Sequence, residues 1–275
     1  LLNFKLNMSP KKILKKAIPS KIFELAEPYG HALESLALQI KAGFPAKNIN
    51  VIGVTGTSGK TTTTTIIASV LKAAGYKVGY LTTAELDLGK GVKHNPTRMT
   101  TLPTSMLIKS IKEAKANGLD WIVLETSSHA LQQRRVIGIP FTAGVVTNLT
   151  KEHLDCHKTF QAYINAKKRL FKLVAKNNKG LGIGVVNADD EVASSFGDIT
   201  GQKTISFGIK NGDVKPSAIK KSPSGNKFTV NYSNINFNVS SSLPGEFNIY
   251  NTLAASALAI KLGRKPEDIA KGIAN

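Results

Sequence analysis

The sequence contains almost no cysteine and no long apolar run. Cys156 is the single cysteine among 275 residues, so no disulfide can form within the chain, as is usual for proteins of a reducing cytoplasm. No apolar stretch approaches the ~18–20 residues that span a bilayer, and no small-residue cleavage site of a secretory signal follows the N-terminal lysines. We therefore expect a cytoplasmic protein without a transmembrane segment.

Acidic residues are also scarce. The chain has 18 Asp and Glu against 37 Lys and Arg, a net charge of +19 and a pI near 9.9. Such a surface attracts polyanions, including nucleic acids, anionic lipids and nucleotides. The lysines are spread along the whole chain, however, and no recognition-helix, zinc or RNP-type motif accompanies them, so we expect no specific nucleic-acid partner. A protein that binds polyanions or membranes through its charge remains an alternative.

Residues 1–48 form a basic segment with eight lysines and three glutamates. The stretches 9–26 and 31–44 carry Ile, Leu and Phe at helical spacing. This pattern predicts two short amphipathic helices that pack on the following domain. Weak contact of this segment with an anionic membrane surface is the alternative.

Residues 49–275 alternate apolar, β-branched runs with helical patterns, which is typical of an α/β fold. We expect a P-loop-type, mostly parallel sheet that helices cover on both faces. The expected strands are 50–56, 77–83, 120–126, 141–149 and 180–190, and the expected helices are 60–75, 104–118, 159–177, 248–263 and a last one from 265. Within 203–240, three runs at 203–208, 227–233 and 235–241 predict short antiparallel strands, joined by a Lys/Pro/Ser/Gly segment at 210–226.

The stretch VTGTSGKTTTTT, residues 54–65, lies between an expected strand and an expected helix. Glycines allow backbone N–H groups to converge on phosphate oxygens, and the start of a helix adds partial positive charge. Lys60 would reach the β- and γ-phosphates, and the Thr61 hydroxyl would bind Mg²⁺. The common phosphate-loop pattern has glycine where this chain has Val54.

The T-G-T-x-G-K-T-T variant of the loop resembles the ATP loop of the Mur ligase superfamily. Four later stretches, in the same order as in that superfamily, strengthen the resemblance. They are ETSSHALQQRRV at 125–136, TNLTKEHLDCH at 147–157, YINAKKRLF at 163–171 and LPGEFNIYNTLAA at 243–255. Together they are similar to the muramyl-tripeptide synthetase branch, with Thr126 and Glu152 as mild departures from its motifs.

The resemblance implies ATP and Mg²⁺ as cofactors. It assigns ATP binding to Gly56, Thr57, Ser58, Gly59, Lys60, Thr61 and Thr62, with Asn248 and Asn251 at the adenine. It assigns Mg²⁺ to Thr61, Glu125, His153 and, if carbamylated, Lys167. Lys60, Glu125, His153 and Lys167 are thereby the expected catalytic residues.

The resemblance also implies a UDP-muramyl peptide as substrate. It assigns substrate contacts to Thr100, Thr101, Ser127, Gln133 and Arg135. The implied reaction forms an acyl phosphate from a substrate carboxylate and ATP, after which an amino acid, lysine or diaminopimelate, displaces phosphate during peptidoglycan precursor synthesis. Two alternatives are another ligase of the superfamily, such as a folylpolyglutamate synthetase, and an ATP-binding module that lacks ligase activity.

The family's domain plan is matched only in part. Its N-terminal uridine-binding domain is much longer than residues 1–48, and its C-terminal domain would follow residue 275. We expect residues 49–275 to be the central ATP-binding domain of a monomeric protein.

Overall fold

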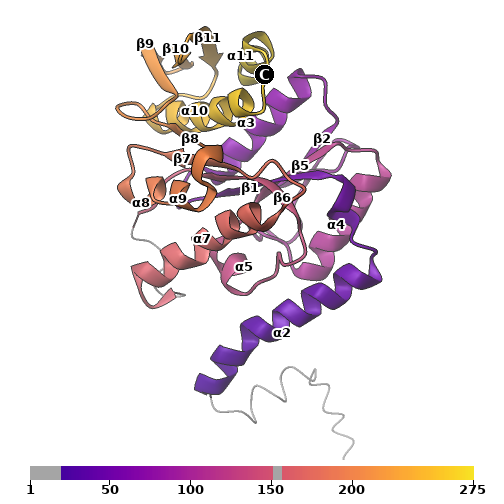
Figure 1. Cartoon of the computed structure of the whole chain (residues 1–275). Coiled ribbons are helices and arrows are strands. Elements are labelled where there is room, and N and C mark those ends of the chain that lie inside the picture. Colours follow the sequence, from indigo (N-terminus) through magenta and orange to yellow (C-terminus); the bar gives the residue numbers. More distant parts are fainter. Residues whose placement is uncertain (1–19, 151–156) are drawn as a thin grey trace, which may run out of the picture.

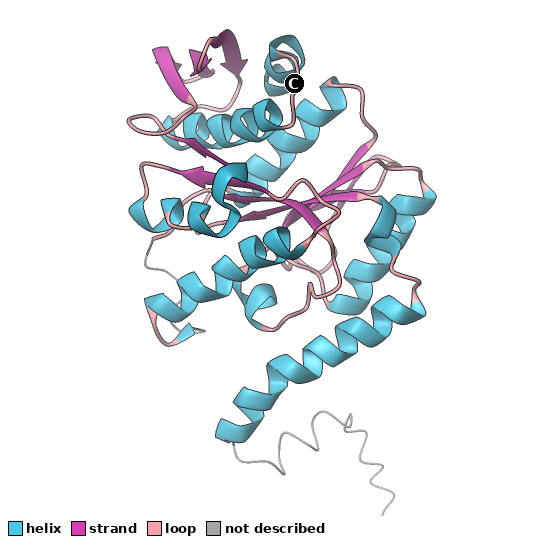
Figure 2. Cartoon of the chain, in the orientation of Figure 1, coloured by secondary structure: helices cyan, strands magenta, loops and turns pink. Residues whose placement is uncertain are grey.

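The computed structural model describes residues 20–150 and 157–275, which are built around an eight-stranded sheet (Figures 1 and 2). The strands lie in the order β4-β3-β2-β5-β1-β6-β7-β8. Their bounds are β1 Asn50–Thr55, β2 Val78–Leu81, β3 Glu85–Asp87, β4 Val92–His94, β5 Trp121–Glu125, β6 Phe141–Val146, β7 Ile183–Asn187 and β8 Thr204–Phe207. All neighbours from β2 to β8 in this order are parallel, and the two antiparallel pairs are β2 with β3 and β3 with β4. The expectation of a mostly parallel sheet is confirmed.

Helices cover both faces of this sheet (Figure 1). One face is covered by α3 Lys60–Ala73 and α10 Glu246–Lys261, and α11 Pro266–Ala274 packs on the outer side of α3. The other face is covered by α4 Thr104–Ala116, α5 Ser128–Gln132 and α7 Phe160–Lys176. The shorter elements around this sheet are the helices α8 Glu191–Ser194 and α9 Gly197–Thr200 and the 3₁₀ turns η1 Pro45–Asn48 and η2 Gly201–Lys203.

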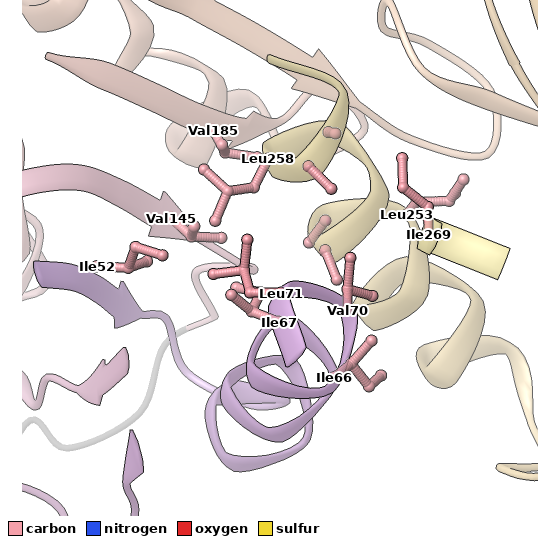
Figure 3. Packing of buried hydrophobic residues seen from close by; sticks show 14 of the residues in the cluster. Ile52, Ile66, Ile67, Val70, Leu71, Val145, Val185, Leu253, Leu258 and Ile269 are labelled. Atoms are coloured by element: carbon pink, nitrogen blue, oxygen red, sulfur yellow. The ribbon is translucent and has the colours of Figure 1, made fainter. Parts of the chain in front are cut away.

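The core on the α3 face holds the phosphate-loop helix in place. Figure 3 shows Ile67 and Leu71 of α3 directed toward the strand residues Ile52 and Val145 and toward Leu258 of α10. Ile67 and Leu71 are each 1% exposed, and burying a side chain of this size stabilises the fold by ~1.5–3 kcal/mol. Apolar packing therefore fixes α3 at the carboxyl end of β1.

A second, three-stranded antiparallel sheet lies beyond α10 and α11 (Figure 1). It consists of β9 Lys215–Ser222, β10 Gly225–Tyr232 and β11 Ile235–Ser241.

Two predictions for residues 203–240 are wrong, the direction of the strand at 203–208 and the absence of a strand from 210–226. The strand at 203–208 is β8, which pairs in parallel with β7 because α8 and α9 carry the chain back across the sheet. The polar segment at 210–226 includes the edge strand β9, where Pro216 is tolerated.

In the described part of the N-terminal segment, α2 Ser20–Lys41 is one helix without the expected break between residues 26 and 31, and residues 9–19 of the first expected helix lie outside the described residues. Local signals at Pro28 and Gly30 predict a break, but the helix continues through both residues. Its C-terminal half is anchored by tertiary contacts that override these local preferences: the buried Ser35 hydroxyl donates to the carbonyl of Ile137 at 2.9 Å, and the side chain of Gln39 packs against Gly138. The expected packing on the following domain is therefore present. No helix among the described residues is long and apolar enough to cross a membrane.

The carboxylate of Asp189 ties β7 to the loop that follows β8. It accepts hydrogen bonds from the backbone N–H groups of Ile209, Lys210 and Asn211 at 2.7–3.0 Å, and from the hydroxyl of Tyr250 at 2.9 Å. Burial alone would raise the pKa of Asp189, but these donated hydrogen bonds outweigh it and hold the pKa below its usual value. The ionised carboxylate is thus a structural element of this region.

We expect Asp189→Ala to lower the free energy of unfolding by ~1–3 kcal/mol at pH 7, because several donors lose a charged acceptor. Since the pKa is depressed in the folded state, this contribution is present above the unfolded pKa of ~3.9 and is lost as the pH falls through the folded value. Urea unfolding at pH 7 and near pH 2.5 measures it: the difference between wild type and variant should shrink at the lower pH. Asp198→Ala, at an exposed position, serves as the control, and an equal loss at both pH values would contradict the assignment.

Candidate functional site

A four-residue loop joins β1 to α3 at the carboxyl edge of the sheet. Gly59 occupies the position before the helix with φ +79°, and Gly56 has φ +149°. A Cβ at Gly56 would overlap the hydroxyl of Thr147, and a Cβ at Gly59 would overlap the side chain of Asn251. Both positions therefore require glycine, as expected of a loop whose backbone closely approaches a ligand.

The strand end after β6 supports this loop. The N–H groups of Thr57 and Ser58 donate to the backbone and side-chain oxygens of Asn148, at 2.8 and 3.0 Å. The hydroxyl of Thr147 donates to the carbonyl of Ser58 at 2.7 Å. Lys60 Nζ donates to the carbonyl of Thr57 at 2.7 Å, which curls the lysine over the loop. Contacts within the chain therefore hold the loop in this shape, and the sequence alone assigns no role to Thr147 or Asn148.

A buried carboxylate lies beside the first turn of α3, which contains Thr61 and Thr62. Glu125 is 3% exposed at the end of β5, and its Oε2 accepts from the Thr61 hydroxyl at 2.9 Å and from the N–H of Thr83 at 2.8 Å. The structure thus brings together two of the expected Mg²⁺ ligands.

The donor set fits Mg²⁺. A hydroxyl and a carboxylate are oxygen ligands, and this ion is usually held by one or two carboxylates together with phosphate oxygens and water. The described residues contain no cluster of three His, Cys, Asp or Glu side chains that would hold a metal unaided. The expected ligand His153 lies outside the described residues.

Lys167 of α7 lies directly under the phosphate loop. It is 2% exposed, its Nζ donates to the carbonyl of Gly56 at 2.7 Å, and it lies 4.5 Å from the centre of the Tyr163 ring. The Tyr163 hydroxyl is 3.0 Å from the hydroxyl of Thr57. The carbamylation of Lys167 stays a prediction, whereas the hydrogen bond of Lys167 to Gly56 places this lysine within the site.

A cavity of about 370 Å³ opens next to the phosphate loop. It is lined by Gly56, Lys60, Arg98, Met99, Thr100, Thr101, Ser127, Ser128, His129, Arg135, His157 and Lys167. The Thr101 hydroxyl accepts from the N–H of Ser127 at 2.9 Å and donates to the carbonyl of Glu125 at 3.0 Å, which joins the expected substrate loop to the expected metal ligand. Gln133 is not among the lining residues.

Several lining residues were missed by sequence reasoning. His129 and Arg135 lie close enough to interact: burial and the nearby Arg135 charge lower the pKa of His129, and burial lowers the pKa of Arg135. His157 is 3% exposed, and its Nε2 lies 2.9 Å from the hydroxyl of Ser128. His129 and His157 belong to the motif stretches at 125–136 and 147–157, so their place in those motifs was the available signal. Arg98 carried no such signal.

The two asparagines at the start of α10 lie beside the loop. Asn251 is 5% exposed, accepts from the Thr63 hydroxyl at 3.2 Å and donates to Asn248 Oδ1 at 3.0 Å. Asn248 in turn donates to the carbonyl of Pro244 at 2.7 Å. The structure therefore joins residues 248–251 to the phosphate loop, and contact with adenine stays a prediction.

A glycine loop between a strand and a helix of a parallel sheet, with a buried carboxylate at the end of the adjacent strand, defines an α/β domain of the P-loop type. Residues 54–259 match the family described as the Mur ligase middle domain. The chain belongs to this family.

The chain is similar to curated ligases of the same kind from several bacteria. It is 36% identical over 236 residues to a UDP-N-acetylmuramoyl-L-alanyl-D-glutamate–2,6-diaminopimelate ligase of Geobacillus thermodenitrificans, covering 85% of this chain and 48% of that protein. It is 38% identical over 219 residues to the Clostridium botulinum protein of that name, covering 78% and 42%. The chain therefore spans about half the length of the curated relatives it matches.

Solved structures show the same architecture. A structure of a UDP-N-acetylmuramoyl-L-alanyl-D-glutamate–2,6-diaminopimelate ligase superposes with a TM-score of 0.75 at 26% identity, covering 90% of this chain and 50% of that one. A folylpolyglutamate synthetase complex superposes with a TM-score of 0.65 at 19% identity, which shows a shared fold alone.

Proposed function

We propose that this chain provides the ATP-binding and carboxylate-activating part of a ligase that adds an amino acid to a UDP-muramyl peptide. One observation carries the proposal: Lys60, Lys167 and Gly56 line the same cavity as the expected substrate residues Thr100, Thr101, Ser127 and Arg135. A carboxylate bound in this cavity would lie next to the γ-phosphate of an ATP held by the loop. The names of the curated relatives favour diaminopimelate over lysine as the added amino acid.

The proposed reaction has two steps. An oxygen of the substrate carboxylate attacks the γ-phosphorus, and the bond to ADP breaks, which gives an acyl phosphate. The amine of the amino acid then attacks the acyl carbon, loses a proton and displaces inorganic phosphate. Lys60 and Arg135 would orient the anions by charge and hydrogen bonds, which is the main contribution a protein makes to phosphoryl transfer.

Thr61 and Glu125 are the residues that would hold Mg²⁺, with His153 and carbamylated Lys167 proposed for a second ion. When bound, Mg²⁺ would neutralise phosphate charge and stabilise the developing transition state.

The proposal includes a monomeric protein in the cytoplasm, with residues 49–275 as the ATP-binding unit and residues 1–48 as a short basic segment.

Hydroxylamine trapping tests the first step without the incoming amino acid. The chain is incubated with ATP, Mg²⁺ and either UDP-N-acetylmuramoyl-L-alanyl-D-glutamate or a folate, and the acyl hydroxamate is quantified. We expect ATP-dependent hydroxamate from the muramyl substrate only. A product from folate alone would identify a different ligase of the superfamily, and ATP binding without product from either would leave an ATP-binding module.

A further inference from the structure

Arg98 lines the cavity in a backbone conformation that arginine rarely adopts. Its φ is +52°, in the left-handed region that favours glycine or asparagine. Five other non-glycine residues of the described chain have positive φ, and none of them lines this cavity: Phe44, Arg134, Lys158, Ala218 and Ser233. A strained residue at the edge of a cavity is a reason to look for a function.

Hydrogen bonds on both sides of Arg98 hold the loop in this conformation. Asn95 is 4% exposed, and its Nδ2 donates to the carbonyls of Thr82 at 2.7 Å and Met99 at 3.0 Å. Its Oδ1 accepts from the N–H and the hydroxyl of Thr97, at 3.0 and 2.8 Å. The carbonyl of Asn95 accepts from the N–H of Arg98 at 3.2 Å. The loop is thus tied to the end of β2 and presents Arg98 to the cavity.

The charge of the cavity points to an anionic ligand. Lys60, Arg98, Arg135 and Lys167 all line it, and no Asp or Glu of the described chain is among the lining residues. The guanidinium of Arg98 makes no hydrogen bond or ion pair with other described residues, and the residue is exposed at the rim. Lys60 and Lys167 contact the carbonyls of the phosphate loop, so they lie at the nucleotide end of the cavity.

We propose that Arg98 is a specificity-determining residue that binds a second anionic group of the substrate, away from the carboxylate that reacts. The planar guanidinium suits a carboxylate or a phosphate, either of which accepts two parallel hydrogen bonds. This inference rests on the proposed function, because it takes the cavity to be the site of the activated substrate. A UDP-muramyl peptide carries both kinds of anion, a diphosphate and a further carboxylate.

Arg98→Gly removes both the guanidinium charge and the backbone strain, and two measurements distinguish their effects. Glycine adopts φ +52° without steric strain, and this relief offsets its larger unfolded-state entropy, so the variant should be about as stable as wild type in thermal unfolding. We expect its affinity for UDP-N-acetylmuramoyl-L-alanyl-D-glutamate, measured by calorimetry, to fall ~10-fold or more, because a charged hydrogen-bond donor is lost. Its affinity for ATP should stay within about twofold of wild type, since Arg98 makes no hydrogen bond to the phosphate loop, whereas Lys60 and Lys167 do.

Arg134→Gly is the matched control. Arg134 also has positive φ, at +57°, but its guanidinium lies 4.4 Å from the Tyr29 ring and outside the cavity. We expect this variant to bind the muramyl substrate as wild type does. An equal loss in both variants would assign the effect to general surface charge and would overturn the inference.

Two fragments of the substrate identify the anion. Loss of affinity for L-alanyl-D-glutamate but not for UDP would assign a carboxylate to Arg98, and the reverse would assign the diphosphate. Unchanged binding of the whole substrate by Arg98→Gly overturns the role of Arg98 and leaves the proposed function intact. A wild-type chain that binds ATP but none of these three probes overturns the substrate assignment itself.

Discussion

Lys60→Ala should reduce the affinity of the chain for MgATP by ~10- to 100-fold or more. Lys60 is one of two lysines at the phosphate loop, and its Nζ lies over the loop, 2.7 Å from the carbonyl of Thr57. A charged hydrogen bond to a phosphate is worth ~1.5–3 kcal/mol, which corresponds to this range of affinity. Isothermal titration calorimetry with ATP and Mg²⁺ measures the change directly.

Lys112→Ala is the control for charge alone. Lys112 is exposed on α4, so its removal lowers the net charge by the same amount without touching the loop. We expect it to bind MgATP like wild type. If Lys60→Ala also bound like wild type, the glycine loop at residues 56–59 would not be the nucleotide site.

Glu125→Gln should remove the dependence of ATP binding on Mg²⁺. The amide oxygen can still accept from Thr61 and Thr83, so the fold should be retained, but the negative charge that would hold the ion is lost. We expect affinity in the presence of Mg²⁺ to fall ~10- to 100-fold, the size of a charged contact. Without Mg²⁺ it should stay equal or improve, because a carboxylate next to the phosphates repels them.

Calorimetry with and without EDTA, on wild type and variant, tests this metal dependence. Glu267→Gln, at an exposed position on α11, controls for the loss of one negative charge. A Glu125→Gln variant whose ATP affinity still rose with Mg²⁺ as in wild type would contradict the placement of the ion at Glu125.

Features set by neighbouring residues could be predicted from the sequence. The glycine loop that holds Gly56 and Gly59 and leads into Lys60 lies where the sequence predicts it, because it belongs to one strand–loop–helix unit. The helices α3, α4, α7 and α10 begin and end within two residues of the bounds that their periodicity predicts. Glu125 was predicted at a strand end, and parallel strands bring their carboxyl ends to one edge, so it falls beside Thr61.

Features set by distant contacts could not be predicted. The direction of β8 depends on how α8 and α9 cross the sheet, and the continuity of α2 through Pro28 depends on contacts of Ser35 with a segment about 100 residues later. Local propensity contains neither piece of information, because each outcome is decided by the packing of surfaces that the chain brings together only on folding.

The residues of the candidate site fall into the same two groups, those that the sequence predicts and those that only the tertiary structure places there. The sequence by itself determined the glycine loop and the family, because these depend on residue types at fixed short spacings, and it placed Glu125 at the end of a strand. The parallel pairing of β1 with β5 then brings Glu125 beside Thr61. Only the tertiary structure decided that Arg98 shares a cavity with Lys60 and Arg135, and that Gln133 does not line it. Arg98 is placed there by the hydrogen bonds of Asn95 to the end of β2, and such a contact leaves no trace in the spacing of a motif.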